Sequence, residues 1–371
     1  MRILIAPDKF KGTLSGSEAA AAMAEGALRV YPDAVVTAVP IADGGEGTVE
    51  AAVAAGFEEH FSSVVGPILQ PAGAVWAFAE KSRTAVIESA QASGTLLCPA
   101  TVENALRAHS YGTGQLVAAA LDAGAREIII GLGGSAMTDA GTGALRALGL
   151  KLLDAAGNLV PLGGGSLIDV VAVDATGLDP RLATVKIRLA LDVDNPLYGY
   201  NGAAHIFAAQ KGADADAIEL LDAGLRNYSS VVREATGVDP DVPGAGAAGG
   251  FPASFLAFAQ ATTERGFDLV AGLVGLDAQL EHSDLVITGE GSMDAQSLSG
   301  KGPIGVADAA HAKGIPVVVV AGRISVTPEQ LAAHGVVAAV SLLELAGSVE
   351  AATAEAALHL TRATSEALNG F

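Results

Sequence analysis

The chain has few of the residues and patterns that mark secreted or membrane-spanning proteins. A single cysteine, Cys98, excludes an intramolecular disulfide and a cysteine-based metal cage. The apolar runs are about four to eight residues long, well below the ~18–20 residues that cross a bilayer. Met1 leads directly into a strand pattern, without a secretory hydrophobic region. These absences predict a cytoplasmic protein with no membrane partner.

Positive charge is also scarce, with 21 Lys and Arg against 41 Asp and Glu and a net charge of −20. Nucleic-acid binding requires a basic surface, so a nucleic-acid partner is not expected. An acidic protein that binds an anion must concentrate its cations locally, and lysines that precede glycine are therefore informative. Lys11 and Lys301 follow predicted strands, whereas Lys313 fits a helix C-terminus. For Lys211 both interpretations stay open.

Aromatic residues make up only 4% of the chain, although half of the residues are hydrophobic. The cores must therefore consist of Ala, Val, Leu and Ile. A chain of 371 residues exceeds the ~250–300 residues at which single cores stop growing, so we expect two domains.

Short apolar segments separated by helical patterns predict a doubly wound α/β sheet. The expected strands are 2–6, 35–41, 284–288, 316–321 and 336–341. Ser15 with Glu18 predicts a capping box at the start of the first helix. Val64–Ala90 is more typical of a hairpin-bearing insert. The Gly- and Pro-rich stretch 238–252 could be a linker, a mobile lid or an active-site loop.

Several predicted strands end in loops that combine glycine with charge. Glu290, Asp294 and Lys301 follow one strand, and the other residues of this kind are Asp8, Lys9, Lys11, Asp43 and Glu46. Ligands of open α/β sheets bind beyond the carboxyl ends of the strands. Carboxylate oxygens suit Mg²⁺ and lysines suit phosphate, so these loops predict a metal–phosphate site.

A glycine turn at Gly131–Gly143 predicts a helix start, around Gly133, Gly134 and Ser135, that binds an anion. The same turn also fits a Gly-x-Gly-x-x-Ala dinucleotide fingerprint, with Asp154 as the ribose acceptor. The rival hypothesis is therefore an NAD-dependent oxidoreductase of a small hydroxy acid.

Asp192 follows another predicted strand, where a general base or a metal ligand is expected. Asp194 with the following Asn-Pro is better explained as a turn. No two histidines lie at metal-ligand spacing, so a histidine-based zinc site is not expected.

Seven motifs in order resemble those of the bacterial type I glycerate kinases. They are Ala6–Gly12, Ile41–Thr48, Gly131–Ala136, Asp192–Leu197, Gln210–Ala213, Gly246–Gly250 and Thr288–Gly291 with Asp294, Gln296 and Gly300-Lys301. The resemblance implies Mg²⁺-dependent transfer of the ATP γ-phosphoryl group to D-glycerate, with 2-phosphoglycerate favoured over 3-phosphoglycerate. It also implies two α/β domains with the active site in the cleft between them. One domain, flavodoxin-like, would comprise 1–60 and 265–371, and the inserted one 61–264.

On this basis Asp192 is expected to be the catalytic base, with Lys11 as a second catalytic residue. Glu290 and Asp294 are expected to hold Mg²⁺. The substrate- or nucleotide-binding residues would be Asp8, Lys9, Asp43, Glu46, Gly133, Gly134, Ser135, Asp139, Lys211 and Lys301. A non-catalytic small-anion-binding protein is a further alternative, because it would share the lysine loops. Whether the chain forms a homodimer is left open.

Overall fold

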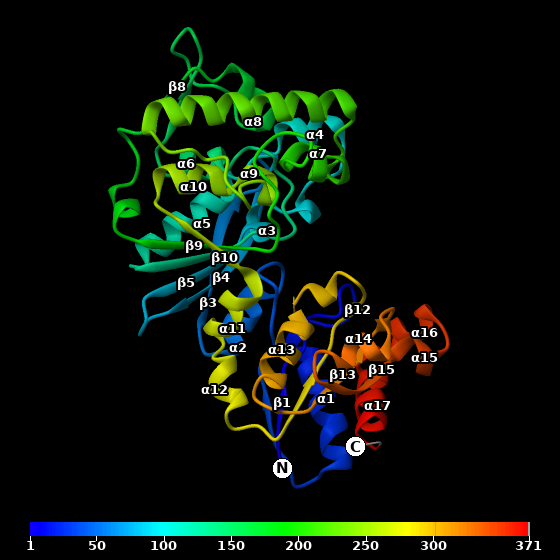
Figure 1. The fold of residues 1–371 in the computed structure, drawn as a ribbon. Helices are drawn as coiled ribbons and strands as arrows, with labels where there is room; N and C mark the ends of the chain where they lie inside the picture. The colour runs from blue at the N-terminus through cyan, green and yellow to red at the C-terminus, as the bar shows by residue number, and fades with distance from the viewer. Residues whose placement is uncertain (301, 370–371) are drawn as a thin grey trace. The chain divides into compact units, whose positions relative to one another are not determined.

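The computed structural model describes residues 1–300 and 302–369, and it has a mixed α/β fold with parallel sheets. The contacts divide the chain into two compact units (Figure 1). Unit 1 comprises Met1–Asp43, Glu50–Gly56 and Phe267–Phe371, and unit 2 comprises Gly44–Val49 and Phe57–Gly266.

Unit 1 is built on a five-stranded parallel sheet. Its strands are β1 (Arg2–Ile5), β2 (Val35–Ala38), β11 (Leu285–Thr288), β13 (Val317–Ala321) and β15 (Val336–Ser341). They lie in the order β15-β13-β11-β1-β2, and all five predicted strands are confirmed. β13 consists of four valines and an alanine that are all buried, as expected for a strand covered on both faces.

Helices cover both faces of this sheet (Figure 1). On one face α1 (Gly16–Val30) and α17 (Ala356–Asn369) pack through Met23 and Leu360 against β1 and β13. On the other face lie α11 (Gly266–Leu273), α12 (Leu276–Leu280), α13 (Gly302–His311) and α14 (Pro328–Ala332). The remaining elements are α2 (Thr48–Ala54), α15 (Leu342–Ala346), α16 (Val349–Ala354) and the paired short strands β12 (Ser292–Met293) and β14 (Arg323–Ile324). The predicted capping box of Ser15 and Glu18 is confirmed at the start of α1.

Unit 2 contains a six-stranded sheet in the order β10-β9-β6-β5-β4-β3. Its strands are β3 (Glu58–Val65), β4 (Pro71–Ala79), β5 (Thr84–Glu88), β6 (Glu127–Gly131), β9 (Lys186–Leu191) and β10 (Thr262–Arg265). β5, β6, β9 and β10 are parallel, so their carboxyl ends share one edge. β3, β4 and β5 pair antiparallel, which confirms the predicted hairpin-bearing segment.

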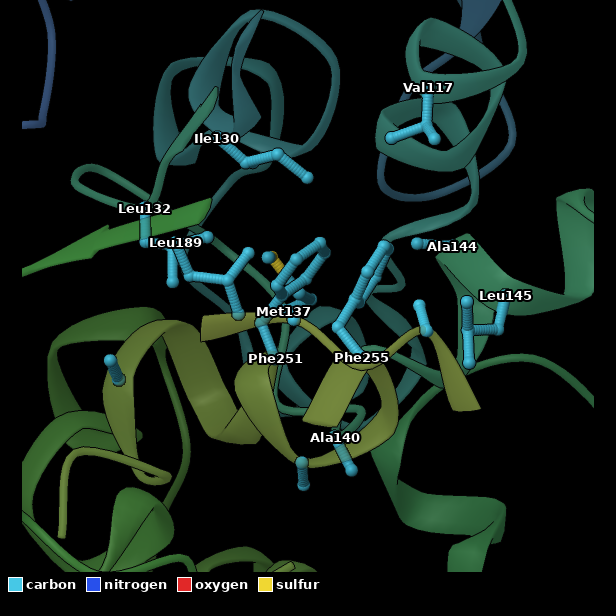
Figure 2. Packing of buried hydrophobic residues seen from close by; sticks show 14 of the residues in the cluster. Val117, Ile130, Leu132, Met137, Ala140, Ala144, Leu145, Leu189, Phe251 and Phe255 are labelled. Carbon is cyan, nitrogen blue, oxygen red and sulfur yellow. The ribbon is translucent and has the colours of Figure 1, made fainter. Parts of the chain in front are cut away.

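The helices of unit 2 are α3 (Ser89–Ser93), α4 (Val102–Arg107), α5 (Tyr111–Asp122), α6 (Thr142–Ala147), α7 (Ala203–Phe207), α8 (Ala215–Thr236), α9 (Ala247–Gly250) and α10 (Pro252–Phe258). A small antiparallel pair, β7 (Lys151–Leu153) with β8 (Ala172–Asp174), forms a separate sheet. Figure 2 shows part of the core, where Phe251 and Phe255 stack with ring centroids 4.7 Å apart. Met137 and Leu189 pack in the same buried cluster.

The Gly- and Pro-rich stretch 238–252 ends inside this core. Ala247, Gly249 and Gly250 are buried, and Gly249 has a φ of +69°. A Cβ atom at Gly249 would lie 2.1 Å from the carbonyl oxygen of Met137, so the backbones pack directly on each other. This end of the stretch is a packed element of unit 2, which argues against a solvated linker or a mobile lid there.

Among the described residues, no helix is both long and apolar enough to span a membrane.

Candidate functional site

The carboxyl edge of the unit 1 sheet carries an acidic cluster, which we define as Asp8, Asp43, Glu290 and Asp294. Asp8 follows β1, Asp43 follows β2, and the other two follow β11 and β12. Asp8 is only 8% exposed, and its carboxylate accepts a 2.7 Å hydrogen bond from the backbone N–H of Lys9. Burial raises the pKa of Asp8 to about 6; nearby Lys9 lowers it, whereas the charge of Asp43 raises it.

In Glu290, burial and the neighbouring carboxylates both disfavour the ionised side chain. Its Oε1 atom is buried and has no hydrogen-bond partner among the described residues. Burial raises its pKa to about 7, against the lowering effect of a hydrogen bond with Ser297. The negative charges of Asp8, Asp294 and Asp43 raise the pKa further, because the carboxylates of the acidic cluster repel one another.

The acidic cluster fits a hard divalent cation such as Mg²⁺, which prefers oxygen ligands. A bound cation would contact Glu290 Oε1, which has no hydrogen-bond partner in the described part of the chain, and its positive charge would offset the repulsion between the carboxylates. Within the described part of the chain, no three His, Cys, Asp or Glu side chains already form a metal-binding group. Mg²⁺ is usually held by one or two carboxylates together with water and substrate phosphate, so a complete protein cage is not required.

Two short turns position the rest of this edge. The backbone N–H of Asp294 donates to Ser297 Oγ at 3.2 Å, and Asp294 Oδ1 accepts from the backbone N–H of Gln296 at 2.8 Å. Lys11 is exposed in a turn in which Phe10 bridges to Leu14. Lys9 Nζ lies 3.7 Å from Asp8 Oδ1. Lys301, predicted to bind phosphate, lies outside the described residues.

The carboxyl edge of the unit 2 sheet places Asp192 directly after β9. One of its oxygens, Oδ1, accepts a 3.1 Å hydrogen bond from the backbone N–H of Gly266, which follows β10. This bond fixes the carboxylate at the strand end, where the sequence predicts a base.

The segment Gly44–Val49, which contains Glu46, lies against the same edge of unit 2. A Cβ atom at Gly44 would lie 2.8 Å from the Cβ of Ala190, at the end of β9. A Cβ atom at Gly133 would lie 2.6 Å from the Cα of Gly45. Glycine is therefore required because backbone segments from β6, β9 and the Glu46 loop approach closely. Glu46, Asp192 and the Gly133–Ser135 turn thus belong to one edge.

The prediction that Gly133–Ser135 starts a helix is wrong. Ser135 forms an isolated bridge with Gly94, and α6 begins only at Thr142. Ala140 and Gly141, just before the helix, have φ values of 56° and 73°. Such left-handed residues cannot continue a helical run, so the turn after β6 remains irregular.

Asp139 occupies the beginning of α6 as an internal anion. Its fully buried carboxylate accepts hydrogen bonds from the backbone N–H groups of Gly141 and Gly143, and from both the N–H and the hydroxyl of Ser110. These donors are the groups that an external anion would otherwise use at a helix start. The Asp139 carboxylate is therefore already hydrogen-bonded by donors inside unit 2.

Lys211 is also buried, with 6% of its surface exposed. Its Nζ donates a 2.6 Å hydrogen bond to the carbonyl oxygen of Met137, in the loop that leads to Asp139. Burial lowers its pKa to about 8, although the charge of Asp139 acts in the opposite direction. The side chain holds this loop from within unit 2.

The described structure lacks two features that a dinucleotide-binding fingerprint requires. The glycine turn does not open directly into a helix, and β7, which precedes Asp154, pairs with β8 and not with β6. The Asp154 carboxylate accepts from the N–H groups of Ala156 and Asn158 in its own turn. It therefore supports a local loop and is not placed as a ribose acceptor.

One residue of the unit 2 edge was missed from the sequence. Glu88, the last residue of β5, is 3% exposed, and its Oε1 accepts a 2.8 Å hydrogen bond from the N–H of Val49. It ties the Glu46 segment to the sheet. A charged residue that ends an otherwise apolar strand, Thr84–Glu88, is the signal that could have identified it.

Comparisons with known proteins point to one family. The model of the glycerate kinase family matches residues 3–370. The glycerate 2-kinase of Escherichia coli (strain K12) is 46% identical over 98% of this chain and 96% of its own length. The glycerate kinase of Bacillus subtilis (strain 168) is 44% identical over 98% and 95%. The crystal structure of a candidate glycerate kinase 2 from Salmonella typhimurium LT2 superposes with a TM-score of 0.87 at 40% identity, covering 100% of this chain and 98% of that one.

Proposed function

The chain belongs to the glycerate kinase family, and we propose that it transfers the γ-phosphoryl group of ATP to a hydroxyl group of D-glycerate with the help of Mg²⁺. The observation that carries this proposal is the family match along residues 3–370. The name of the 46% identical Escherichia coli relative, glycerate 2-kinase, supports 2-phosphoglycerate as the product. The acidic cluster, in which Glu290 Oε1 has no hydrogen-bond partner among the described residues, supports the choice of a divalent cation.

We further infer that the two units are domains, of which unit 1 is flavodoxin-like. The strand order β2-β1-β11-β13-β15 corresponds to 2-1-3-4-5 within unit 1, which is the order of flavodoxin-like sheets. The division of contacts supports an insertion, because unit 1 is assembled from both ends of the chain. Ligands of such sheets bind beyond the carboxyl ends of their strands, where the acidic cluster lies.

In this proposal unit 1 binds the metal and the phosphates. Phosphoryl transfer depends mainly on positioning and charge neutralisation. Glu290 and Asp294 would hold Mg²⁺, which when bound supplies positive charge to the phosphoryl oxygens. Lys9 and Lys11 would add positive charge at the same strand ends, and Asp8 would orient Lys9 through the contact seen between them.

Unit 2 would supply the base. Asp192, held through Oδ1 by the N–H of Gly266, would accept the proton of the glycerate hydroxyl as that hydroxyl attacks phosphorus. Glu46 and the turn of Gly133, Gly134 and Ser135 lie on the same edge and would bind the substrate.

Asp139 and Lys211 would support the site and not contact the ligands, since both side chains are buried. We propose that they position the loop after β6 through the carbonyl of Met137 and the start of α6. Asp43 remains with the acidic cluster as a proposed substrate or nucleotide contact.

The test is a turnover assay with ATP, D-glycerate and MgCl₂, each omitted in turn. ADP should form only when all three are present, and ³¹P NMR of the product should show 2-phosphoglycerate. Hydride transfer to or from a nicotinamide, without glycerate-dependent ADP, would favour the oxidoreductase. Glycerate binding without either reaction would favour a non-catalytic anion-binding protein.

A further inference from the structure

A pocket of about 240 Å³ lies at the carboxyl edge of the unit 1 sheet. It is lined by residues that follow four parallel strands: Phe10 and Lys11 after β1, Gly291 after β11, Arg323 after β13, and Leu342 after β15. Val349 of α16 closes another side. Because successive parallel strands all end at this edge, the pocket occupies the position in which open α/β sheets bind ligands.

The wall of the pocket is continuous with the acidic cluster. The N–H of Gly322 donates to the carbonyl oxygen of Glu290 at 2.9 Å, and the N–H of Arg323 donates to that of Gly291 at 3.1 Å. A Cβ atom at Gly322 would lie only 2.4 Å from the Gly291 oxygen, so the two backbones pack without room for a side chain. A ligand in the pocket would therefore adjoin the segment that carries the Glu290 carboxylate.

The lining combines two kinds of chemistry. Leu342, Val349 and Phe10 offer apolar surface, whereas Lys11 and Arg323 are exposed cations. Apolar walls with a few convergent polar groups are typical of sites for small organic molecules and cofactors. The two cations favour a ligand that carries an anionic group beside its apolar part. The net charge of the chain is −20, so two cations beside one apolar pocket concentrate positive charge at this place.

We propose that this pocket binds the purine base of a nucleoside triphosphate, with the phosphates directed past Lys11 and Arg323 towards the acidic cluster. Ligand pockets for whole organic molecules usually measure ~300–1,000 Å³. The pocket is smaller, at about 240 Å³, so it suits one part of the nucleotide while the triphosphate lies outside. This inference rests on the proposed kinase function and assigns the nucleotide to unit 1.

The test fills the pocket without disturbing the core. Val349 is 59% exposed, so Val349→Trp adds bulk to the pocket wall at a surface position. The matched control is Val337→Trp on β15, where the valine is 56% exposed and does not line the pocket. Circular dichroism and thermal unfolding establish that both variants are folded.

Isothermal titration calorimetry then compares two probes in the presence of MgCl₂: the non-hydrolysable ATP analogue AMP-PNP and inorganic tripolyphosphate. V349W should weaken AMP-PNP binding at least tenfold and leave tripolyphosphate binding unchanged. V337W should bind both probes as the parent does. R323Q, which removes a cation without adding bulk, should weaken both probes together and tests the phosphate path. V349F, with the same expected selectivity for AMP-PNP as V349W, is the second pocket variant if V349W does not fold.

Unchanged AMP-PNP binding by folded V349W would overturn the pocket assignment, and the kinase proposal would survive if the parent still converts glycerate. Equal weakening of both probes by V349W would also overturn it, since the pocket would then hold phosphate and not the base. If R323Q binds both probes as the parent does, the phosphate path is wrong. A parent that binds no AMP-PNP and forms no ADP would refute the kinase proposal together with this inference.

Discussion

Replacing Glu290 by glutamine should stabilise the protein at neutral and alkaline pH while impairing its catalysis. The parent carboxylate is half-buried at the end of β11, and its Oε1 has no partner among the described residues. Burial and neighbouring carboxylates raise its pKa from 4.5 to about 7. E290Q keeps nearly the same shape and removes the charge.

The sign of the effect follows from the raised pKa. Between pH 4.5 and about 7 the folded chain keeps a proton on Glu290 that the unfolded chain has released. The free energy of unfolding therefore falls as the pH rises through this window. A shift from 4.5 to about 7 corresponds to a loss of up to about 3 kcal/mol at pH 8. Glutamine does not titrate, so E290Q avoids this loss.

Thermal unfolding in EDTA from pH 4.5 to 8.5 measures the difference. E290Q should exceed the parent in Tm by roughly 4 °C at pH 8, relative to their difference at pH 4.5. Glu366→Gln, at an exposed position of α17, is the matched control and should show no such trend. Added MgCl₂ should raise the Tm of the parent at pH 8 but have little effect on E290Q, because the proposed ligand is lost.

A Tm difference between E290Q and the parent that is the same at pH 4.5 and pH 8 would refute the electrostatic reasoning. An E290Q variant that is less stable than the parent at pH 8 would show that the carboxylate is already compensated. Full kinase activity in E290Q would remove Glu290 from the proposed metal site.

Asp192→Asn should lower kcat by ~10²–10⁴ with an unchanged Tm, because asparagine keeps the oxygen that accepts from Gly266 but cannot take a proton; an unimpaired kcat would exclude Asp192 as the base. Lys211→Met should abolish a rise in stability between pH 8 and 10.5. The folded pKa of Lys211 is lowered from 10.5 to about 8, so the unfolded state binds more protons across that window, worth up to about 3 kcal/mol. Urea unfolding at pH 7.5 and 10 measures the free energy of unfolding of both proteins. If that free energy changes equally with pH in parent and variant, Lys211 is not the buried titrating group.

The sequence predicted well those features that depend on neighbouring residues. The valine run of β13, the capping box of Ser15 and Glu18, and the antiparallel strands around β4 all follow from contiguous residue patterns. Turn preference, capping and side-chain alternation act over a few residues, so one sequence reports them directly.

The sequence could not show partners that lie far away along the chain. Asp139 looked like a ligand-binding carboxylate, but its donor Ser110 lies 29 residues away and closes it into the core. Lys211 looked like either a helix terminus or a phosphate ligand, yet it bonds to Met137 across 74 residues. The degree of burial cannot be read from a local pattern, and it decides whether a charge contacts a ligand or supports a loop.

The sequence by itself determined which residue types stand at the strand ends: carboxylates and lysines beside glycine, after short apolar strands. Only the tertiary structure decided how they are grouped, with Asp8, Asp43, Glu290 and Asp294 on the edge of one sheet and Glu46 and Asp192 on the edge of another. The physical reason is that strand order is set by the packing of helices on sheet faces. Ile3 of β1 and Leu285 of β11, for example, become neighbours because both strands bury their side chains in the same two cores.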